Sequence, residues 1–195
     1  MATDIIDRKL LEWTYGKSAK DARITIFYKI RDIPYAVLPE LNHSERFVDI
    51  FKLNRGSCTP KHLLLCHMFQ KIELEVLYAV YPFQWSDFEA LYPPELQELA
   101  KTMPISYHLV CKINIEGNLV LVDATIDPAL QKLGLPVNEK WDGFEDTLLA
   151  MNPCGEEQLY HPSEAHLMQP PNTDEKSLAF YDGLNSWLEK VRSSQ

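Results

Sequence analysis

Residues 54–70 read NRGSCTPKHLLLCHMFQ, and this stretch joins a turn to the start of an apolar helix. Its first four residues have turn-forming chemistry, because Asn, Gly and Ser suit tight bends. Pro60 fits the first turn of a helix, where no backbone N–H is needed. Leu64 and Met68 then share one face at helical spacing. The stretch therefore predicts a buried helix that begins close to Cys58.

A β-hairpin is predicted downstream of this helix. In residues 106–115, apolar side chains at the odd-numbered positions alternate with mostly polar side chains at the even-numbered ones, which is typical of a strand. A Glu-Gly-Asn turn signal follows at residues 116–118, and residues 119–125 resume a β-forming pattern. If the loop holds two residues, His108 lies diagonal to Asp123 on the same face of the hairpin. A three-residue loop would put the two side chains out of phase.

Further elements are predicted on either side. Residues 75–85 are rich in β-branched and aromatic side chains and favour a strand. Residues 19–32 predict a helix that Ser18 can cap, and Asp174 can cap a last helix near the C-terminus. Residues 152–172 carry four prolines and little periodicity, so they predict a loop. Such a long loop is either a lid over a site or a surface excursion.

Composition indicates one α+β domain over residues 1–195. With 46% apolar residues, a chain of this length buries about two-thirds of its unfolded surface in one core. The net charge of −9 and the pI of about 5.1 argue against nucleic-acid binding, which needs clustered Lys and Arg. No coiled-coil heptad is present, so the oligomeric state stays open.

The sequence also indicates a compartment. It has neither a basic start nor a run of about 18 uncharged apolar residues, so we expect no signal peptide, no membrane span and no membrane partner. Its four cysteines lack the dense spacing of a disulfide scaffold. We therefore expect a cytoplasmic protein whose thiols are reduced.

Cys58, His108 and Asp123 supply the three groups that thiol acyl transfer requires. A helix N-terminus favours the thiolate form of Cys58. An imidazole such as that of His108 can hold the thiol proton, and a carboxylate such as Asp123 orients the ring. Backbone N–H groups at the helix start can stabilise an oxyanion. Candidates for a second oxyanion donor are Tyr35, Asn54 and Gln84.

These residues also carry a family resemblance. Gly56-Ser57-Cys58 opens an apolar helix, a strand and His108 follow, and Asp123 stands in the sequence Val-Asp-Ala-Thr. In this order the chain resembles the transglutaminase-like superfamily. The resemblance implies a papain-like core, with the nucleophile helix packed on an antiparallel β-sheet, over about residues 18–150. It leaves the C-terminal loop and helix, about residues 151–195, outside the match.

The resemblance implies a cysteine enzyme with Cys58, His108 and Asp123 as its catalytic triad. Such an enzyme catalyses acyl transfer or amide and peptide hydrolysis through a thioester intermediate, without a cofactor or a metal. Its partner would be an amide- or thioester-containing substrate, such as a peptide or protein. The chain departs from the family at Leu109, where an aromatic is frequent, and around Glu73, where a glycine is frequent.

Two alternatives share these residues. The first is a non-catalytic transglutaminase-like binding or scaffold module, in which the Cys58 thiol has an ordinary pKa. The second comes from the run Arg55-Gly56-Ser57-Cys58, which is also similar to arylamine N-acetyltransferases. Their second glycine is Ser57 here, and the chain is short for that family. Thiol reactivity distinguishes an enzyme from a module.

A metal site is the competing chemistry on the same helix. Cys58, His62 and Cys66 recur at every fourth residue, with His67 adjacent. A structural zinc site needs four converging ligands, and a straight helix offers two or three of these to one ion. We therefore expect core packing for Cys66. For the other thiols and imidazoles we expect positions without a chemical role: Cys111 in the core, Cys154 in a loop, and His161 and His166 on the surface.

Overall fold

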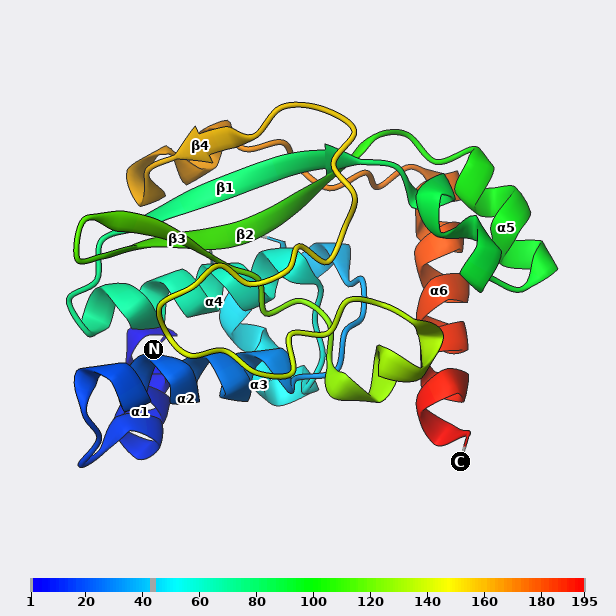
Figure 1. Cartoon of the computed structure of the whole chain (residues 1–195). Helices are drawn as coiled ribbons and strands as arrows, with labels where there is room; N and C mark the ends of the chain where they lie inside the picture. The colour runs from blue at the N-terminus through cyan, green and yellow to red at the C-terminus, as the bar shows by residue number, and fades with distance from the viewer. Residues whose placement is uncertain (1, 43–44, 195) are drawn as a thin grey trace.

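A four-stranded antiparallel sheet forms the upper layer of the molecule in Figure 1, in the order β3-β2-β1-β4. This computed structural model describes residues 2–42 and 45–194. The strands are β1 (Val76–Phe83), β2 (Ser106–Ile115), β3 (Asn118–Val122) and β4 (Gln158–Tyr160). The central pair, β1 and β2, is mostly buried on both faces, which explains its continuous apolar composition.

Helices fill the layer beneath the sheet and one end of it. Figure 1 shows α4 directly under the strands, α1 and α2 below α4, and α5 and α6 beside the end of the sheet. No helix in the described residues is long and apolar enough to cross a membrane. The α-helices are α1 (Ala2–Thr14), α2 (Ala19–Arg31), α3 (Ile50–Leu53), α4 (Cys58–Lys71), α5 (Pro94–Lys101) and α6 (Glu175–Ser193). The short 3-10 helices are η1 (Pro39–Leu41), η2 (Phe47–Asp49), η3 (Trp85–Leu91), η4 (Pro128–Leu133) and η5 (Pro162–Leu167).

Two hydrophobic clusters hold these layers together. The first lies between the sheet, α4 and α2, and includes Phe27, Leu64 and Ile113, all fully buried. The second lies under α6, where Phe180 packs against Trp85 at a ring separation of 5.1 Å. Burying each such side chain contributes about 1.5–3 kcal/mol. The second cluster fixes α6 at the end of the sheet, next to the start of α4.

The α+β class and the main predicted elements are confirmed. Helix α2 begins after Ser18, whose hydroxyl accepts a hydrogen bond from the backbone N–H of Asp21 at 3.1 Å. Strands β2 and β3 form the predicted hairpin with a two-residue loop, because Ile115 pairs with Asn118. Both loop residues have positive φ, as a tight hairpin turn requires. Strand β3 ends at Val122, so Asp123 follows it directly.

Helix α1, strand β4 and helix η5 lie where the sequence predicted no helix or strand. Residues 2–14 form α1, which buries Ile6 and Trp13 on one face, seven residues apart. Within the predicted loop of residues 152–172, strand β4 pairs with β1 and η5 follows it. Strand β4 has only three residues, and such a short strand leaves no readable alternation in a sequence.

Candidate active site

Cys58 is the first residue of α4 and is 8% exposed. The turn before it is tight: a side-chain Cβ at Gly56 would lie 2.8 Å from Cδ1 of Ile50. The Gly56 N–H donates to the carbonyl of Pro34 at 3.0 Å, and its carbonyl accepts from the N–H of Ala36 at 3.2 Å. This pairing fixes the start of α4 against Tyr35. Glycine therefore leaves space here for the side chains of Ile50 and Pro60.

The structure brings His108 and Asp123 into direct contact. Both side chains are buried, and Nε2 of His108 lies 2.8 Å from Oδ2 of Asp123. The other ring nitrogen of His108, Nδ1, is buried and has no hydrogen-bond partner in the described residues. The thiol of Cys58 is a close electrostatic neighbour of this ring. The three predicted residues thus lie in the order thiol, imidazole, carboxylate.

Backbone groups hold the Asp123 carboxylate. Its Oδ2 also accepts a hydrogen bond from the N–H of Ala150 at 2.8 Å, and its Oδ1 accepts from the N–H of Thr125 at 2.9 Å. Its own N–H donates to Oγ1 of Thr147 at 2.7 Å. A carboxylate with this many donors is fixed in position and stays ionised.

The charges of the three groups are coupled. Burial disfavours the charged form of each, yet the neighbouring charges and hydrogen bonds outweigh it. The His108 imidazolium holds the pKa of Asp123 well below its usual range. The Asp123 carboxylate in turn raises the pKa of His108 to about 10. Burial raises the pKa of the Cys58 thiol, but the neighbouring His108 lowers it by more. The pKa of Cys58 therefore lies below its usual value. The site therefore favours a thiolate beside an imidazolium.

His62 and Lys61 support the site in a way that the sequence did not reveal. Nδ1 of His62 lies 2.8 Å from the carbonyl of Cys58, and its Nε2 accepts from the N–H of Ala124 at 2.9 Å. Nζ of Lys61 donates to the carbonyls of Ala124 and Thr125 at 3.3 and 2.7 Å. Both side chains are fully buried, and burial lowers the pKa of His62 to about 4 and that of Lys61 to about 7. Together they fasten α4 to the residues that follow Asp123.

This arrangement leaves no room for a metal at His62, because both of its ring nitrogens are occupied. No group of three or more His, Cys, Asp or Glu in the described part of the chain is arranged to hold a metal ion. Cys66 and Cys111 are buried core residues, and Cys154 is exposed, as expected. In the sequence, the only sign of the role of His62 was a polar pair, Lys61-His62, inside an apolar helix.

Cys58 lies in the wall of a cleft of about 430 Å³. The cleft is bounded by the start of α4, by the ends of β1 and β2, by α6 and by residues 163–172. We name residues 163–172 the strap. The strap belongs to the predicted loop of residues 152–172, for which the sequence allowed either a lid over a site or a surface excursion. It forms a wall of the cleft. His166 lies on it and is exposed, whereas His161 caps η5.

Of the three candidate oxyanion donors, only Tyr35 lines the cleft. Asn54 and Gln84 are exposed, and Asn54 ends α3 in a left-handed conformation. The backbone of Tyr35 is fixed on both sides: its N–H donates to Oδ2 of Asp127 at 2.8 Å, and its carbonyl accepts from Nη2 of Arg192 at 2.7 Å. Burial raises the pKa of Tyr35, so its hydroxyl keeps the proton that it would donate.

The sequence matches no known family model and no curated protein. Among solved structures, it is similar to a "Putative Cysteine Protease" from Cytophaga hutchinsonii, with a TM-score of 0.44 and 15% sequence identity. The match covers 64% of this chain and 37% of that chain. The matched region is thus little more than a third of the length of that protein.

Proposed function

We propose that the protein is a transglutaminase-like cysteine enzyme with a papain-like core, which transfers or hydrolyses acyl groups through a thioester at Cys58. One observation carries the proposal. The buried His108 has one ring nitrogen 2.8 Å from Asp123, while the other is buried, has no hydrogen-bond partner within the usual distance limits in the described part of the chain, and belongs to a ring that interacts with the Cys58 thiol. A structural histidine would satisfy both nitrogens, as His62 does. The open nitrogen of His108 is available to exchange a proton with the thiol and the substrate.

The proposed reaction follows from these positions. The Cys58 thiolate attacks the carbonyl carbon of an amide or thioester, and the carbonyl oxygen becomes an oxyanion. Free N–H groups at the start of α4 and the hydroxyl of Tyr35 stabilise this charge. The imidazolium of His108 then gives its proton to the leaving amine or thiol, and a thioester to Cys58 remains. Water or an amine, deprotonated by His108, attacks the thioester and releases the thiolate.

The test is the pH dependence of iodoacetamide labelling at Cys58, followed by mass spectrometry, in the native protein and in His108→Ala and Asp123→Ala. We expect a low apparent pKa in the native protein that is lost in both variants. Each unit by which the pKa rises cuts the thiolate fraction about tenfold at a pH below both values. The exposed Cys154 serves as an internal reference in every sample.

Folding has to be separated from activation in this test. Removal of one partner from a buried ion pair is strongly destabilising, so circular dichroism is recorded for each variant. Asp123→Asn provides a milder change that keeps the shape of the side chain. An ordinary pKa at Cys58 in all of the folded proteins would contradict the enzyme and favour the non-catalytic binding module.

A further inference from the structure

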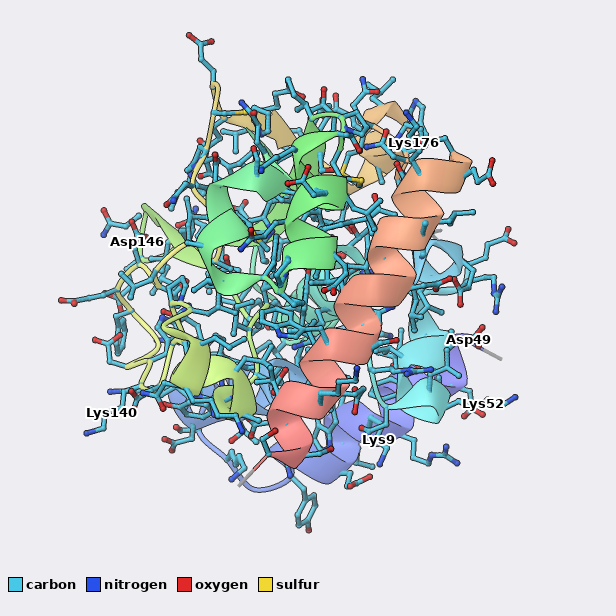
Figure 2. All side chains as sticks on the ribbon, turned by 90° about the vertical axis from the view of Figure 1, so that its right-hand side faces the viewer. Lys9, Asp49, Lys52, Lys140, Asp146 and Lys176 are labelled. Carbon is cyan, nitrogen blue, oxygen red and sulfur yellow. The ribbon has the colours of Figure 1, made fainter. Side chains whose placement is uncertain are left out.

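Apart from the Cys58 thiolate, the described residues that line the cleft carry no acidic side chain and no Lys or Arg. Asp, Glu, Lys and Arg make up 24% of the chain, yet no lining residue in the described ranges is one of these four types. Figure 2 shows where such residues lie instead: Lys52 and Lys140, both exposed, reach the outer edge of the molecule. A charged group that entered the cleft would lose its hydration without gaining a counter-ion from these walls. The walls therefore select against charged groups.

Aromatic side chains form the fixed part of the walls. Phe83, Trp85 and Tyr181 are all less than 10% exposed. The rings of Phe83 and Trp85 meet edge to face with centroids 4.9 Å apart, and Tyr181 lies 6.2 Å from Trp85. The indole N–H of Trp85 donates to Oγ of Ser106 at 2.9 Å, so its polar atom is already satisfied. What this wall offers to a ligand is apolar, polarisable surface.

The strap completes the cleft with adaptable and uncharged groups. Met168 and Pro170 add apolar surface, and a thioether packs readily against rings of different shape. Gln169 and Asn172 are neutral amides that can orient a backbone-like amide by hydrogen bonds. In the described ranges, His166 is the one histidine among the residues that line the cleft. Its side chain is exposed.

We propose that this cleft selects an acyl donor whose side chain, beside the carbonyl attacked by Cys58, is neutral and aromatic. The inference rests on the proposed function, because it assumes that Cys58 is the acylated atom. The cleft volume of about 430 Å³ lies within the range of small-molecule sites, which is about 300–1,000 Å³. It accommodates a ring together with the amide next to it.

Three matched alkylating reagents test the inference: N-benzyl iodoacetamide, its 4-carboxybenzyl analogue and its 4-aminomethylbenzyl analogue. Each carries the same reactive group, and the charge lies at the far end, away from the His108 imidazolium. The rate at Cys58 is divided by the rate at the exposed Cys154 in the same sample. We expect this ratio to be about tenfold higher for the neutral reagent than for either charged one, because burying a charged end without a counter-ion costs free energy.

Two variants of the strap sharpen the test. Gln169→Lys should raise the ratio for the carboxylate reagent, and Gln169→Glu should raise it for the ammonium reagent, each by several-fold, because the wall then supplies a counter-ion. Gln158→Lys, on the exposed β4, adds the same charge outside the cleft and should leave all three ratios as they are.

The two possible failures are distinguishable. If Cys58 shows a low pKa with iodoacetamide but equal ratios for all three reagents, the neutral aromatic preference is overturned and the proposed enzyme stands. If Cys58 shows an ordinary pKa with iodoacetamide, both the enzyme and the substrate preference are overturned. A neutral-reagent preference that the Gln169 variants reverse in the expected directions supports the inference.

Discussion

His62 joins α4 to the segment that carries Asp123, and it does so as a neutral ring. Its Nδ1 lies against the carbonyl of Cys58 and its Nε2 accepts from the N–H of Ala124, so the ring needs one proton, on Nδ1. Its Nε2 lies 3.6 Å from Oδ1 of Asp123. A second proton would sit where the N–H of Ala124 already points. The hydrogen bonds thus agree with the low pKa of this residue.

A pH dependence of stability follows at this residue. Burial lowers the pKa of His62 to about 4, whereas a histidine in an unfolded chain titrates near 6.5. Between these values the unfolded state binds a proton that the folded state does not, so stability falls as the pH falls. His62→Gln removes this titration. From pH 7 to pH 4 the native protein should lose up to roughly 3 kcal/mol more than the variant does.

Urea unfolding of both proteins at several pH values measures this difference. The variant is expected to be the less stable protein at pH 7, since it cannot satisfy both partners of the ring. The comparison therefore uses the slope of the unfolding free energy against pH in each protein. Equal slopes for the two proteins between pH 4 and 6.5 would rule out a neutral His62.

The turn that precedes α4 is the element on which the position of Cys58 depends. Gly56 packs against Ile50 and Pro60 more closely than any side chain permits. Gly56→Ala requires either the fully buried Ile50 side chain or the turn to move, and overpacking of this kind costs about 1–3 kcal/mol. The variant should also lose the low thiol pKa of Cys58, because the start of α4 shifts away from His108.

Gly183→Ala is the matched control for this turn. Gly183 lies within α6, where the new methyl group meets only the end of the Leu96 side chain at 3.2 Å. Alanine is favoured over glycine inside a helix by about 1 kcal/mol, so stability should change little or rise. Thermal unfolding and the pH dependence of iodoacetamide labelling are measured for both variants. A Gly56→Ala protein with the native melting temperature and the native Cys58 pKa would contradict a role of this turn in placing Cys58.

At the scale of elements, local signals were sufficient for the capped helices α2 and α6 and for the β2–β3 hairpin, but not for α1. The sequence placed His108 close to Asp123 only if the β2–β3 loop held two residues; the structure has that loop and brings the two side chains into contact. The roles of Lys61 and His62 could not be predicted, because they depend on the position of Ala124, which lies 62 residues from His62. The position of the strap on the cleft wall could not be predicted either, because it depends on contacts with residues that are distant in the sequence.

The whole molecule is closed by its last helix. Figure 2 shows α6 running the length of the near face. Nη2 of Arg192, in its last turn, lies 2.7 Å from Oδ2 of Asp127 and also reaches the carbonyl of Tyr35. Nδ2 of Asn185 donates to the carbonyl of Val37 at 2.8 Å. Although the family resemblance left this helix outside the core, it fixes the segment that carries Tyr35.

The ion pair between Arg192 and Asp127 predicts the effect of an uncharged residue at position 192. Arg192→Leu leaves the Asp127 carboxylate buried without its partner and should lower the free energy of unfolding by roughly 3 kcal/mol. The double variant Arg192→Leu with Asp127→Asn removes the stranded charge and should be more stable than Arg192→Leu alone. Chemical denaturation of the single and double variants measures both effects. A double variant that is no more stable than Arg192→Leu would contradict a buried ion pair.

The distribution of the cleft along the chain has a consequence for synthesis on the ribosome. Translation delivers Cys58 first, then His108 and Asp123, and delivers Tyr181 on α6 last of the four. The nascent chain therefore carries an unactivated thiol until its imidazole has emerged, and an open groove until the last helix docks. If Cys58 is acylated as proposed, productive acylation has to wait until α6 has emerged and docked, which protects the growing polypeptide from the thiol.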